Sequence, residues 1–196
     1  MSELFSIQLQ NRQQQGRDGV WLDLPTTTEQ VQAALRQIGI SSDNPQGLFI
    51  SGYFAEEEKR FAIPYNMVLA SNVDELNFLA SRLETLSTGE RAELNAALQA
   101  PQSELFSIGR ITDFPENVDY YVHLPDVRGP AQLGDYYLNR SGMVDMPEEW
   151  KGGIDTAQFG RYVAQQEQGV FTEYGYLVKS GDAWQKVHEG QPVPEE

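Results

Sequence analysis

Apolar residues recur along this chain at two spacings, one typical of strands and one typical of helices. The first clear strand pattern is Val20–Leu24, which ends at a proline. Apolar side chains then fall three and four residues apart over residues 31–38, which predicts one face of a helix that ends at Gly39. Residues 48–50 predict a second buried strand. Strand, helix and strand together predict a small α+β unit.

Helix-capping pairs mark the starts of three predicted helices. A Ser, Thr or Asn side chain can accept a hydrogen bond from a backbone N–H three residues on, where a Glu or Gln can return the bond. Leucines at helical spacing follow the two central pairs, and roughly two residues separate those helices, which predicts a helical hairpin. The pairs are the threonines at 26–28 with Glu29 or Gln30, Asn72 with Glu75, and Ser87 with Glu90.

Strand and helix patterns alternate again after residue 102. Tyr120, Val122 and Leu124 predict the apolar face of a strand, with Tyr121 and His123 on its polar face. The later elements are a helix around residues 133–137 that ends at Gly142, a helix capped by Asp155 that ends at Gly169, and strands at 170–172 and 174–178, the second weakened by Gly175.

The order of these patterns predicts an α+β protein of three small subdomains. We expect residues 1–66 to form an α+β subdomain, residues 67–102 a helical one, and residues 103–196 a second α+β one with a short mobile tail beyond Gly190. The sequence Ser-Glu-Leu-Phe-Ser-Ile occurs at residues 2–7 and 103–108. The first copy is typical of extended chain, whereas Ser103 is placed to cap a helix, so we interpret the repeat as coincidence.

Charge is the unusual property of this composition. The chain has 29 acidic and 14 basic residues, a net charge of -15. Such a chain repels nucleic acid and anionic membranes and attracts proteins with a basic groove, although acidity also serves plain solubility. The negative balance is spread over the chain and is largest after residue 102. Acids recurring in that part predict an extended negative face, formed by Asp113, Glu116, Asp119, Asp126, Asp135, Asp145, Glu148, Glu149 and Asp155.

Signatures of catalysis are absent from the sequence. It holds no nucleophile elbow, phosphate-binding loop, dinucleotide turn or zinc-binding His pair. We interpret His123 and His188 as solvated surface residues. Asp113, Glu116 and Asp119 have a spacing that could suit a cation, but a proline interrupts them and the glycine of an EF-hand loop is missing. We therefore expect no enzyme activity, no metal and no cofactor.

Cysteine and targeting signals are also missing. The chain has no cysteine, which excludes disulfides and thiolate sites. The first residues lack the basic and apolar regions of a secretion signal, and no apolar run approaches the ~20 residues of a membrane helix. We expect a cytoplasmic protein that binds neither membrane nor nucleic acid. A hydrolase or lyase that uses carboxylates, or an acidic adaptor for an unrelated basic protein, are the alternatives to a specific inhibitor.

Five short motifs follow one another along the chain. They are VWLDLP at 20–25, DELNFLA at 74–80, LPDV at 124–127, DTAQFGR at 155–161 and GVFTEYGY at 169–176. Their order and spacing are similar to those of the ArdA family of antirestriction proteins, over residues 18–190. The chain departs from the family where Tyr162 replaces a frequent acid, where Lys-Gly-Gly occupies 151–153, and where Gly52 and Phe54 flank Tyr53 without an acid.

The resemblance implies an elongated homodimer of three subdomains that mimics duplex DNA. Its implied target is the specificity and methyltransferase core of type I restriction–modification enzymes, and the family is implied to travel on mobile genetic elements. Duplex DNA carries one negative charge per ~1.7 Å of its axis, so carboxylates on a rigid fold can compete for the same cationic groove. The nine acids named above are the residues expected to form this surface.

Overall fold

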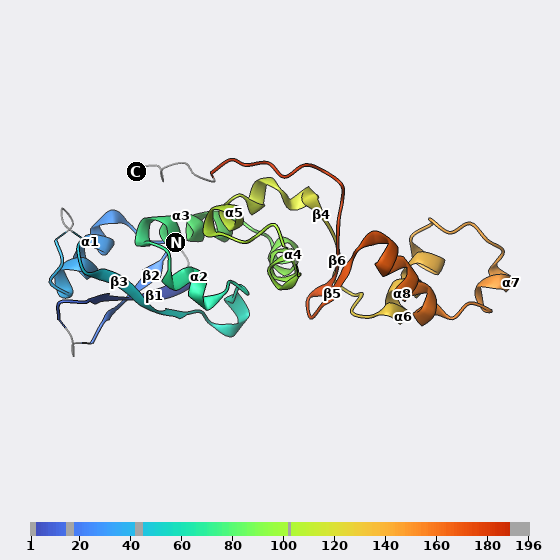
Figure 1. Ribbon diagram of the computed structural model, residues 1–196, viewed down its shortest axis with the longest axis horizontal. Helices are drawn as coiled ribbons and strands as arrows, with labels where there is room; N and C mark the ends of the chain where they lie inside the picture. The colour runs from blue at the N-terminus through green and yellow to red at the C-terminus, as the bar shows by residue number, and fades with distance from the viewer. Residues whose placement is uncertain (1–2, 15–17, 42–44, 102, 189–196) are drawn as a thin grey trace. The chain divides into compact units, whose positions relative to one another are not determined.

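The computed structural model describes residues 3–14, 18–41, 45–101 and 103–188 (Figure 1). Over these residues the protein is a mixed α+β fold with eight α-helices and two three-stranded antiparallel sheets. The chain divides into two compact units. Unit 1 comprises Met1–Leu86, Leu105–Glu116 and Lys186–Glu196, and unit 2 comprises Ser87–Glu104 and Asn117–Gln185. The tail predicted beyond Gly190 lies outside the described residues.

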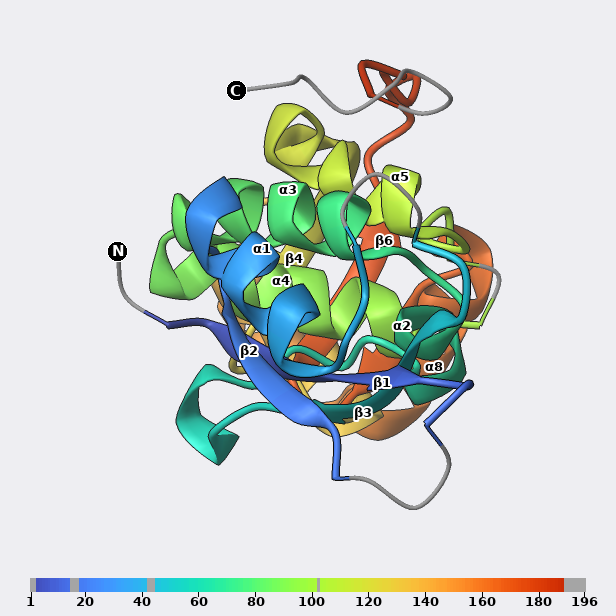
Figure 2. The same ribbon diagram turned by 90° about the vertical axis from the view of Figure 1, so that its left-hand side faces the viewer.

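Unit 1 is built on a sheet of strand order β2-β1-β3. Its strands are β1 (Phe5–Asn11), β2 (Val20–Leu24) and β3 (Leu48–Phe54). Alternation along β1 buries Phe5, Ile7 and Leu9 completely. Figure 2 shows α1 and α3 on one side of this sheet. The strands predicted at 20–24 and 48–50 are confirmed, and β3 continues four residues further than predicted.

Four helices belong to unit 1, and local capping explains where two of them begin. Thr27 and Gln30 form the reciprocal box at the start of α1, and Gly39 follows its end with a φ of 69°. Asn72 accepts a hydrogen bond from the Glu75 N–H at the start of α3. The helices are α1 (Thr28–Gln37), α2 (Tyr65–Leu69), α3 (Val73–Glu84) and α5 (Ile108–Thr112).

The repeated hexapeptide adopts two different structures. The first copy runs into β1 as extended chain, whereas the second leads to α5. Ser107, not Ser103, caps α5, because its side chain accepts the Arg110 N–H at 3.2 Å. The predicted cap at Ser103 was therefore wrong, and the repeat does not mark a duplicated unit.

Unit 2 combines one sheet of order β4-β6-β5 with four helices. Helix α4 contacts β4 and β6, and α6 packs along α8. A capping box of Ser87 and Glu90 starts α4, as predicted. The elements are α4 (Thr88–Gln99), β4 (Tyr121–Leu124), α6 (Pro130–Asp135), the π-helical turn Tyr136–Arg140, α7 (Glu148–Lys151), α8 (Thr156–Glu167), β5 (Val170–Thr172) and β6 (Gly175–Lys179).

The face predicted for β4 was wrong in part. Tyr121 is buried, and Val122 is 46% exposed. Tyr120 is buried as well, because it ends a 3-10 turn, Val118–Tyr120, and the alternation of the strand starts only after it. Both tyrosines pack edge to face, with ring centroids 4.9 Å apart.

The central helices belong to different units, α3 to unit 1 and α4 to unit 2. The predicted helical hairpin and the division into three subdomains at residues 66 and 102 stay predictions. Within the described parts of the chain, no helix is both long and apolar enough to cross a lipid bilayer.

Candidate functional site

Two of the predicted acidic residues of unit 2, Asp135 and Asp155, lie on helices α6 and α8, which cross closely. A Cβ atom on Gly160 would overlap the Pro130 carbonyl oxygen and lie 2.7 Å from the Gly134 nitrogen, and one on Gly134 would overlap the backbone of Thr156. Only glycine leaves the two helix backbones room at these points. Beside the crossing, Leu133 and Tyr176 are fully buried in one apolar cluster. The close crossing therefore fixes the backbone that carries these two acids.

A partly buried hydrogen-bond group connects the end of α8 to the π-helical turn after α6 and to β6. The Tyr176 hydroxyl donates to a Glu167 carboxylate oxygen at 3.0 Å, and the Tyr137 hydroxyl donates to the other oxygen. Burial, and then the Glu167 carboxylate, raise the pKa of both tyrosines, so both hydroxyls stay protonated donors. A Cβ on Gly169 would overlap the Tyr176 hydroxyl, which explains the glycine there.

Seven of the nine predicted acids lie in unit 2, and local structure sets each position. Asp126 lies in the turn after β4, and Asp135 ends α6. Glu148 and Glu149 lie in the first turn of α7. Asp155 caps α8 by accepting the Gln158 N–H at 2.9 Å. Asp135 is half-buried, and the exposed members are Asp119, Asp126, Asp145, Glu148, Glu149 and Asp155. We call these seven residues the acidic surface of unit 2.

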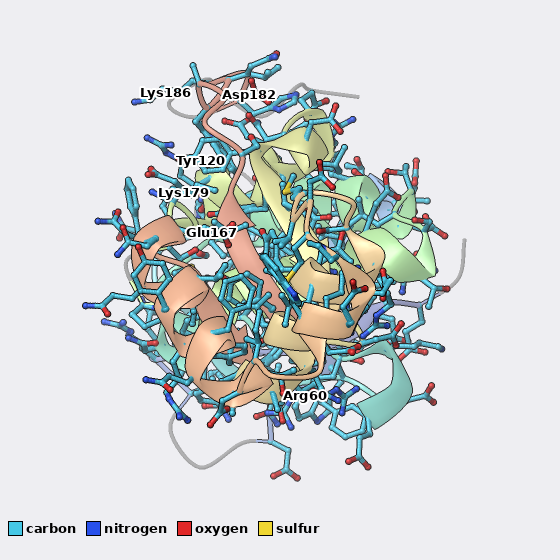
Figure 3. All side chains as sticks on the ribbon, turned by 90° about the vertical axis from the view of Figure 1, so that its right-hand side faces the viewer. Arg60, Tyr120, Glu167, Lys179, Asp182 and Lys186 are labelled. Carbon is cyan, nitrogen blue, oxygen red and sulfur yellow. The ribbon has the colours of Figure 1, made fainter. Side chains whose placement is uncertain are left out.

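Some carboxylates of unit 2 are neutralised within the chain. Asp135 pairs with Arg140 at 3.0 Å, and Glu148 pairs with Lys151 at 2.6 Å. Outside the acidic surface, Glu104 pairs with Lys179 at 2.9 Å, which raises the pKa of that lysine; its ammonium lies beside Tyr120 (Figure 3). Five exposed acids of this surface have no ion pair among the described residues. They are Asp119, Asp126, Asp145, Glu149 and Asp155, of which Asp155 caps α8.

Two predicted surface acids lie in unit 1, and neither presents a free charge. Asp113 is fully buried, which its place in the sequence did not indicate. Its carboxylate accepts the His188 backbone N–H at 2.6 Å and lies 3.0 Å from Nδ1 of the same residue. Glu116 forms an ion pair with Arg82. We leave both residues out of the acidic surface.

The histidines are not the solvated residues that the sequence suggested. His188 is held against the buried Asp113, and its ring meets Phe78 edge to face at 5.2 Å. His123 lies half-buried on β4, with Nε2 2.9 Å from the Tyr174 carbonyl oxygen. Both side chains stabilise the packing of their own unit, because a ring nitrogen of each contacts a group that is distant in the sequence.

An acidic group on α4 was missed by sequence reasoning. Glu93 is half-buried, and one of its oxygens makes no hydrogen bond among the described residues. Burial, followed by the nearby charges of Glu90 and Asp119, raises the pKa of Glu93 to about 8. The sequence around Glu93 gives no sign of its low exposure, which depends on the tertiary packing of α4 on the sheet. At neutral pH this carboxyl is largely uncharged.

Metal ligation has no support in the part of the chain that the structure describes. There, no three His, Asp or Glu side chains come together as a metal site requires. The arrangement of unit 2 instead offers exposed, fixed negative charges to a cationic partner.

Several motif residues stabilise the backbone of their own unit. In unit 1, Asn77 accepts the Thr26 N–H at 2.7 Å and returns a bond to the Thr26 carbonyl at 3.0 Å, which joins α3 to the end of β2. In unit 2, Asp155 caps α8, and Gly160 allows the crossing of α8 with α6. The motif at 155–161 therefore fixes the start and the packing of α8.

The model of a family described as Antirestriction protein (ArdA) matches residues 15–178, which is most of the chain. No curated protein matches the chain.

Proposed function

The chain belongs to the ArdA family of antirestriction proteins, and on that premise we propose that it mimics duplex DNA and inhibits type I restriction–modification enzymes. The acidic surface of unit 2 would take the place of DNA phosphates. The inhibitor would bind the specificity and methyltransferase core of the enzyme and perform no catalysis.

One observation carries this proposal. Asp126, Asp145 and Glu149 are exposed carboxylates that find no cation within the described chain. Unit 2 has 13 acidic and 6 basic residues, so its own cations cannot neutralise the remainder. Charges of this kind gain favourable interactions when a basic groove approaches.

Rigidity supports mimicry over plain acidity. DNA-binding grooves neutralise phosphates with Lys and Arg and release counterions as they do so. Asp155 is fixed by its capping bond, and Asp126 follows directly from a paired strand. Carboxylates on such elements need no ordering on binding and present no base edges, so the enzyme's sequence preference would not limit inhibition.

Dimerisation through unit 2 is part of the proposal. The aromatic residues of unit 2 differ in exposure: Tyr120 and Tyr121 are buried, whereas Trp150 is 66% exposed. Tyr162, on the outside of α8, is 60% exposed. An exposed aromatic residue on a rigid helix suits a two-fold contact, and such a contact would double the negative surface.

Inhibition of DNA cleavage tests the proposal. Unmodified DNA is incubated with a type I enzyme while the protein is titrated in. We expect inhibition near stoichiometric ratios. Each of Asp126→Asn, Asp145→Asn and Glu149→Gln alone should weaken inhibition less than about tenfold, and the triple variant about 5- to 100-fold, since each exposed pair contributes about 0–1 kcal/mol.

A matched triple variant distinguishes the effect of where the charges lie from the effect of the total net charge. Asp18→Asn, Glu57→Gln and Asp74→Asn remove three exposed charges from unit 1. This control should weaken inhibition less than about threefold, because long-range charge effects are screened in salt. Equal losses in both triples would contradict a binding surface on unit 2. Loss of all inhibition from one amide substitution, in a folded protein, would contradict a distributed mechanism.

A further inference from the structure

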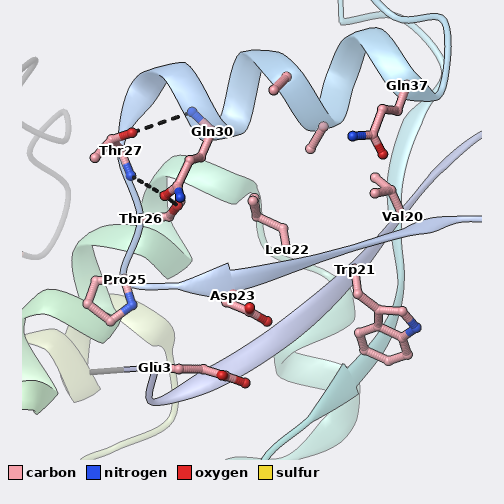
Figure 4. A pocket seen from close by; sticks show the side chains of 12 residues that line it. Glu3, Val20, Trp21, Leu22, Asp23, Pro25, Thr26, Thr27, Gln30 and Gln37 are labelled. Carbon is pink, nitrogen blue, oxygen red and sulfur yellow. Dashed lines mark hydrogen bonds between the residues drawn. The ribbon is translucent and has the colours of Figure 1, made fainter. Parts of the chain in front are cut away.

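A pocket of about 580 Å³ opens in unit 1 between the edge of β2 and helix α1 (Figure 4). Residues of β2 line one side. Helix α1 lines the other with Gln30, Ala33, Ala34 and Gln37. Because the strand order is β2-β1-β3, β2 is an edge strand of the sheet. The pocket is thus a groove beside a strand edge.

The backbone of β2 turns hydrogen-bonding groups into this groove. The Leu24 carbonyl accepts the Leu4 N–H at 2.8 Å, so Leu24 uses its backbone groups on the β1 side. Successive residues of a strand point their backbone N–H and C=O groups to opposite sides, so residues two apart point them to the same side. The backbone groups of Leu22 therefore also face β1. The N–H and C=O groups of Trp21 and Asp23 therefore face the open edge. An unpaired edge of this kind is a template for another strand.

The two faces of the groove differ in chemistry. Leu22 points toward α1 (Figure 4) and, although it is only 6% exposed, it lines the groove together with Ala33 and Ala34. Trp21 and Asp23 point to the opposite face of β2, and the Trp21 indole is 49% exposed. A strand added here would therefore meet an apolar wall on one side and an indole with acidic groups on the other.

Two carboxylates stand side by side on the acidic face. The Ser6 hydroxyl lies 2.9 Å from an Asp23 oxygen and 3.2 Å from a Glu3 oxygen. Neither carboxylate has an ion pair within the described residues. Like charges at this spacing repel, and a cation placed against both relieves the repulsion. The exposed indole beside them adds a cation–π partner.

We propose that this groove binds an extended segment of a partner protein in which apolar and basic residues alternate. The segment adds to β2 as a fourth strand and pairs with the backbone groups of Trp21 and Asp23. Its apolar side chains lie against Leu22 and Ala33, and its Lys or Arg side chains meet Glu3 and Asp23. This site is separate from the acidic surface of unit 2 and does not depend on the proposed antirestriction mechanism.

The negative charge of the groove favours a basic segment of a partner over a second copy of this chain. Edge-to-edge pairing of two β2 strands would bring Glu3 and Asp23 of one copy toward the same acids of the other. Charged side chains at strand edges are a common device against such self-pairing. A basic segment turns the same charges into attraction.

Synthetic peptides test the proposal on the full-length protein. The probe is the capped peptide Val-Lys-Val-Arg-Val-Lys-Val, followed by fluorescence anisotropy and by NMR shifts of the backbone amides. Two peptides serve as controls: one with Glu at every basic position, and one of equal charge with Pro at every Val position, which removes strand-forming N–H groups. We expect saturable binding of the first peptide alone, with the largest amide shifts at Trp21 and Asp23.

Variants on both walls locate the binding. Ala33→Trp fills the groove from α1 and should weaken binding at least tenfold. The double variant Glu3→Gln with Asp23→Asn should weaken it about five- to tenfold at low salt, because two exposed ion pairs are lost. Glu29→Gln with Asp74→Asn removes two exposed charges elsewhere in unit 1 and should leave binding within about twofold.

Three results would overturn the proposal. Equal binding of the proline-containing peptide would mean attraction by net charge alone. Binding unaffected by Ala33→Trp would place the peptide elsewhere. A dimer of the free protein that Ala33→Trp dissociates would make the groove an interface between two copies of this chain.

Discussion

The half-buried carboxyl of Glu93 retains its proton at neutral pH, because burial and two neighbouring acids disfavour its charge. Its pKa of about 8 lies well above the ordinary 4.5. The stabilising effect of the protonated form is therefore complete below about pH 4.5 and is lost as pH rises through 8. Acids in this protein thus differ in function: those on the surface carry charge at neutral pH, and this one does not.

Replacing Glu93 by Gln fixes the uncharged form and gives a pH-dependent prediction. The difference in unfolding free energy, Glu93→Gln minus wild type, should rise by on the order of 1 kcal/mol between pH 5 and pH 9, after allowance for solvent screening. Denaturant unfolding at both pH values measures it. The exposed Glu149→Gln serves as the control and should give the same difference at both. A pH-independent difference for Glu93→Gln would contradict the raised pKa.

At the scale of elements, the sequence predicts those features that depend on contacts between residues close together in the chain. The caps at Thr27, Asn72, Ser87 and Asp155 are confirmed because each involves bonds to a residue only three positions away. The end of α8 differs: Gln168, not Gly169, adopts the left-handed conformation, with a φ of 56°.

Elements without a periodic signal escaped prediction. Helix α7 has four residues and no buried side chain, so it offers no apolar stripe to recognise. The π-helical turn Tyr136–Arg140 extends α6 without a change in its pattern. β1 was foreseen only as extended chain, although Phe5, Ile7 and Leu9 alternate with polar residues, which is a strand signal in the sequence itself.

The sequence predicted in which part of the chain the acidic residues of the candidate site gather, but not which of these residues are exposed. The excess of acids after residue 102 indicated where charge gathers. Burial of Asp113 depends on His188, 75 positions further along the chain, and no local pattern reports such a contact. The ion pair of Glu116 with Arg82 also joins distant parts of the chain, 34 positions apart. Tertiary contacts thus decide which acids remain available.

The crossing of α6 and α8 gives a prediction about stability. Gly160→Ala would drive a methyl group into the Pro130 carbonyl, and backbone atoms cannot yield as a flexible side chain does. We expect a loss of about 1–3 kcal/mol in unfolding free energy, measured in denaturant. Gly89→Ala, in the open first turn of α4, is the control and should stabilise by about 0.5–1 kcal/mol. Equal effects of the two changes would show that the crossing is not tight.

At the scale of the whole molecule, a net charge of -15 favours binding to a specific partner only if the acidic side chains are held in fixed positions. Scattered exposed acids keep a protein dispersed, whereas acids on rigid elements can match a cationic groove. In unit 2, Asp155 caps α8, Asp135 ends α6 and Asp126 lies in the turn after β4, and unit 1 has a separate groove beside β2. Under the two proposals, the acidic surface of unit 2 binds dense positive charge and the groove binds an extended basic segment.

The proposed dimer gives a prediction at this scale. Light scattering at the concentrations of the inhibition assay should report twice the mass of the 22.1 kDa chain. Tyr162→Glu should give a monomer, because it places a charge in the proposed contact on α8. Phe54→Glu, at an exposed aromatic of unit 1, should remain dimeric. A monomeric wild-type protein, or a Tyr162→Glu variant that stays dimeric, would contradict dimerisation through α8.

Competition with DNA for a type I restriction–modification enzyme tests the central claim most directly. Labelled duplex DNA is bound to the enzyme, and its release is followed by anisotropy as the protein is added at two salt concentrations. The account predicts complete release at low salt, a competitor affinity that falls steeply as salt rises, and a weaker competitor when Asp126, Asp145 and Glu149 are replaced by amides. DNA that stays bound in a large excess of the folded protein would contradict the account.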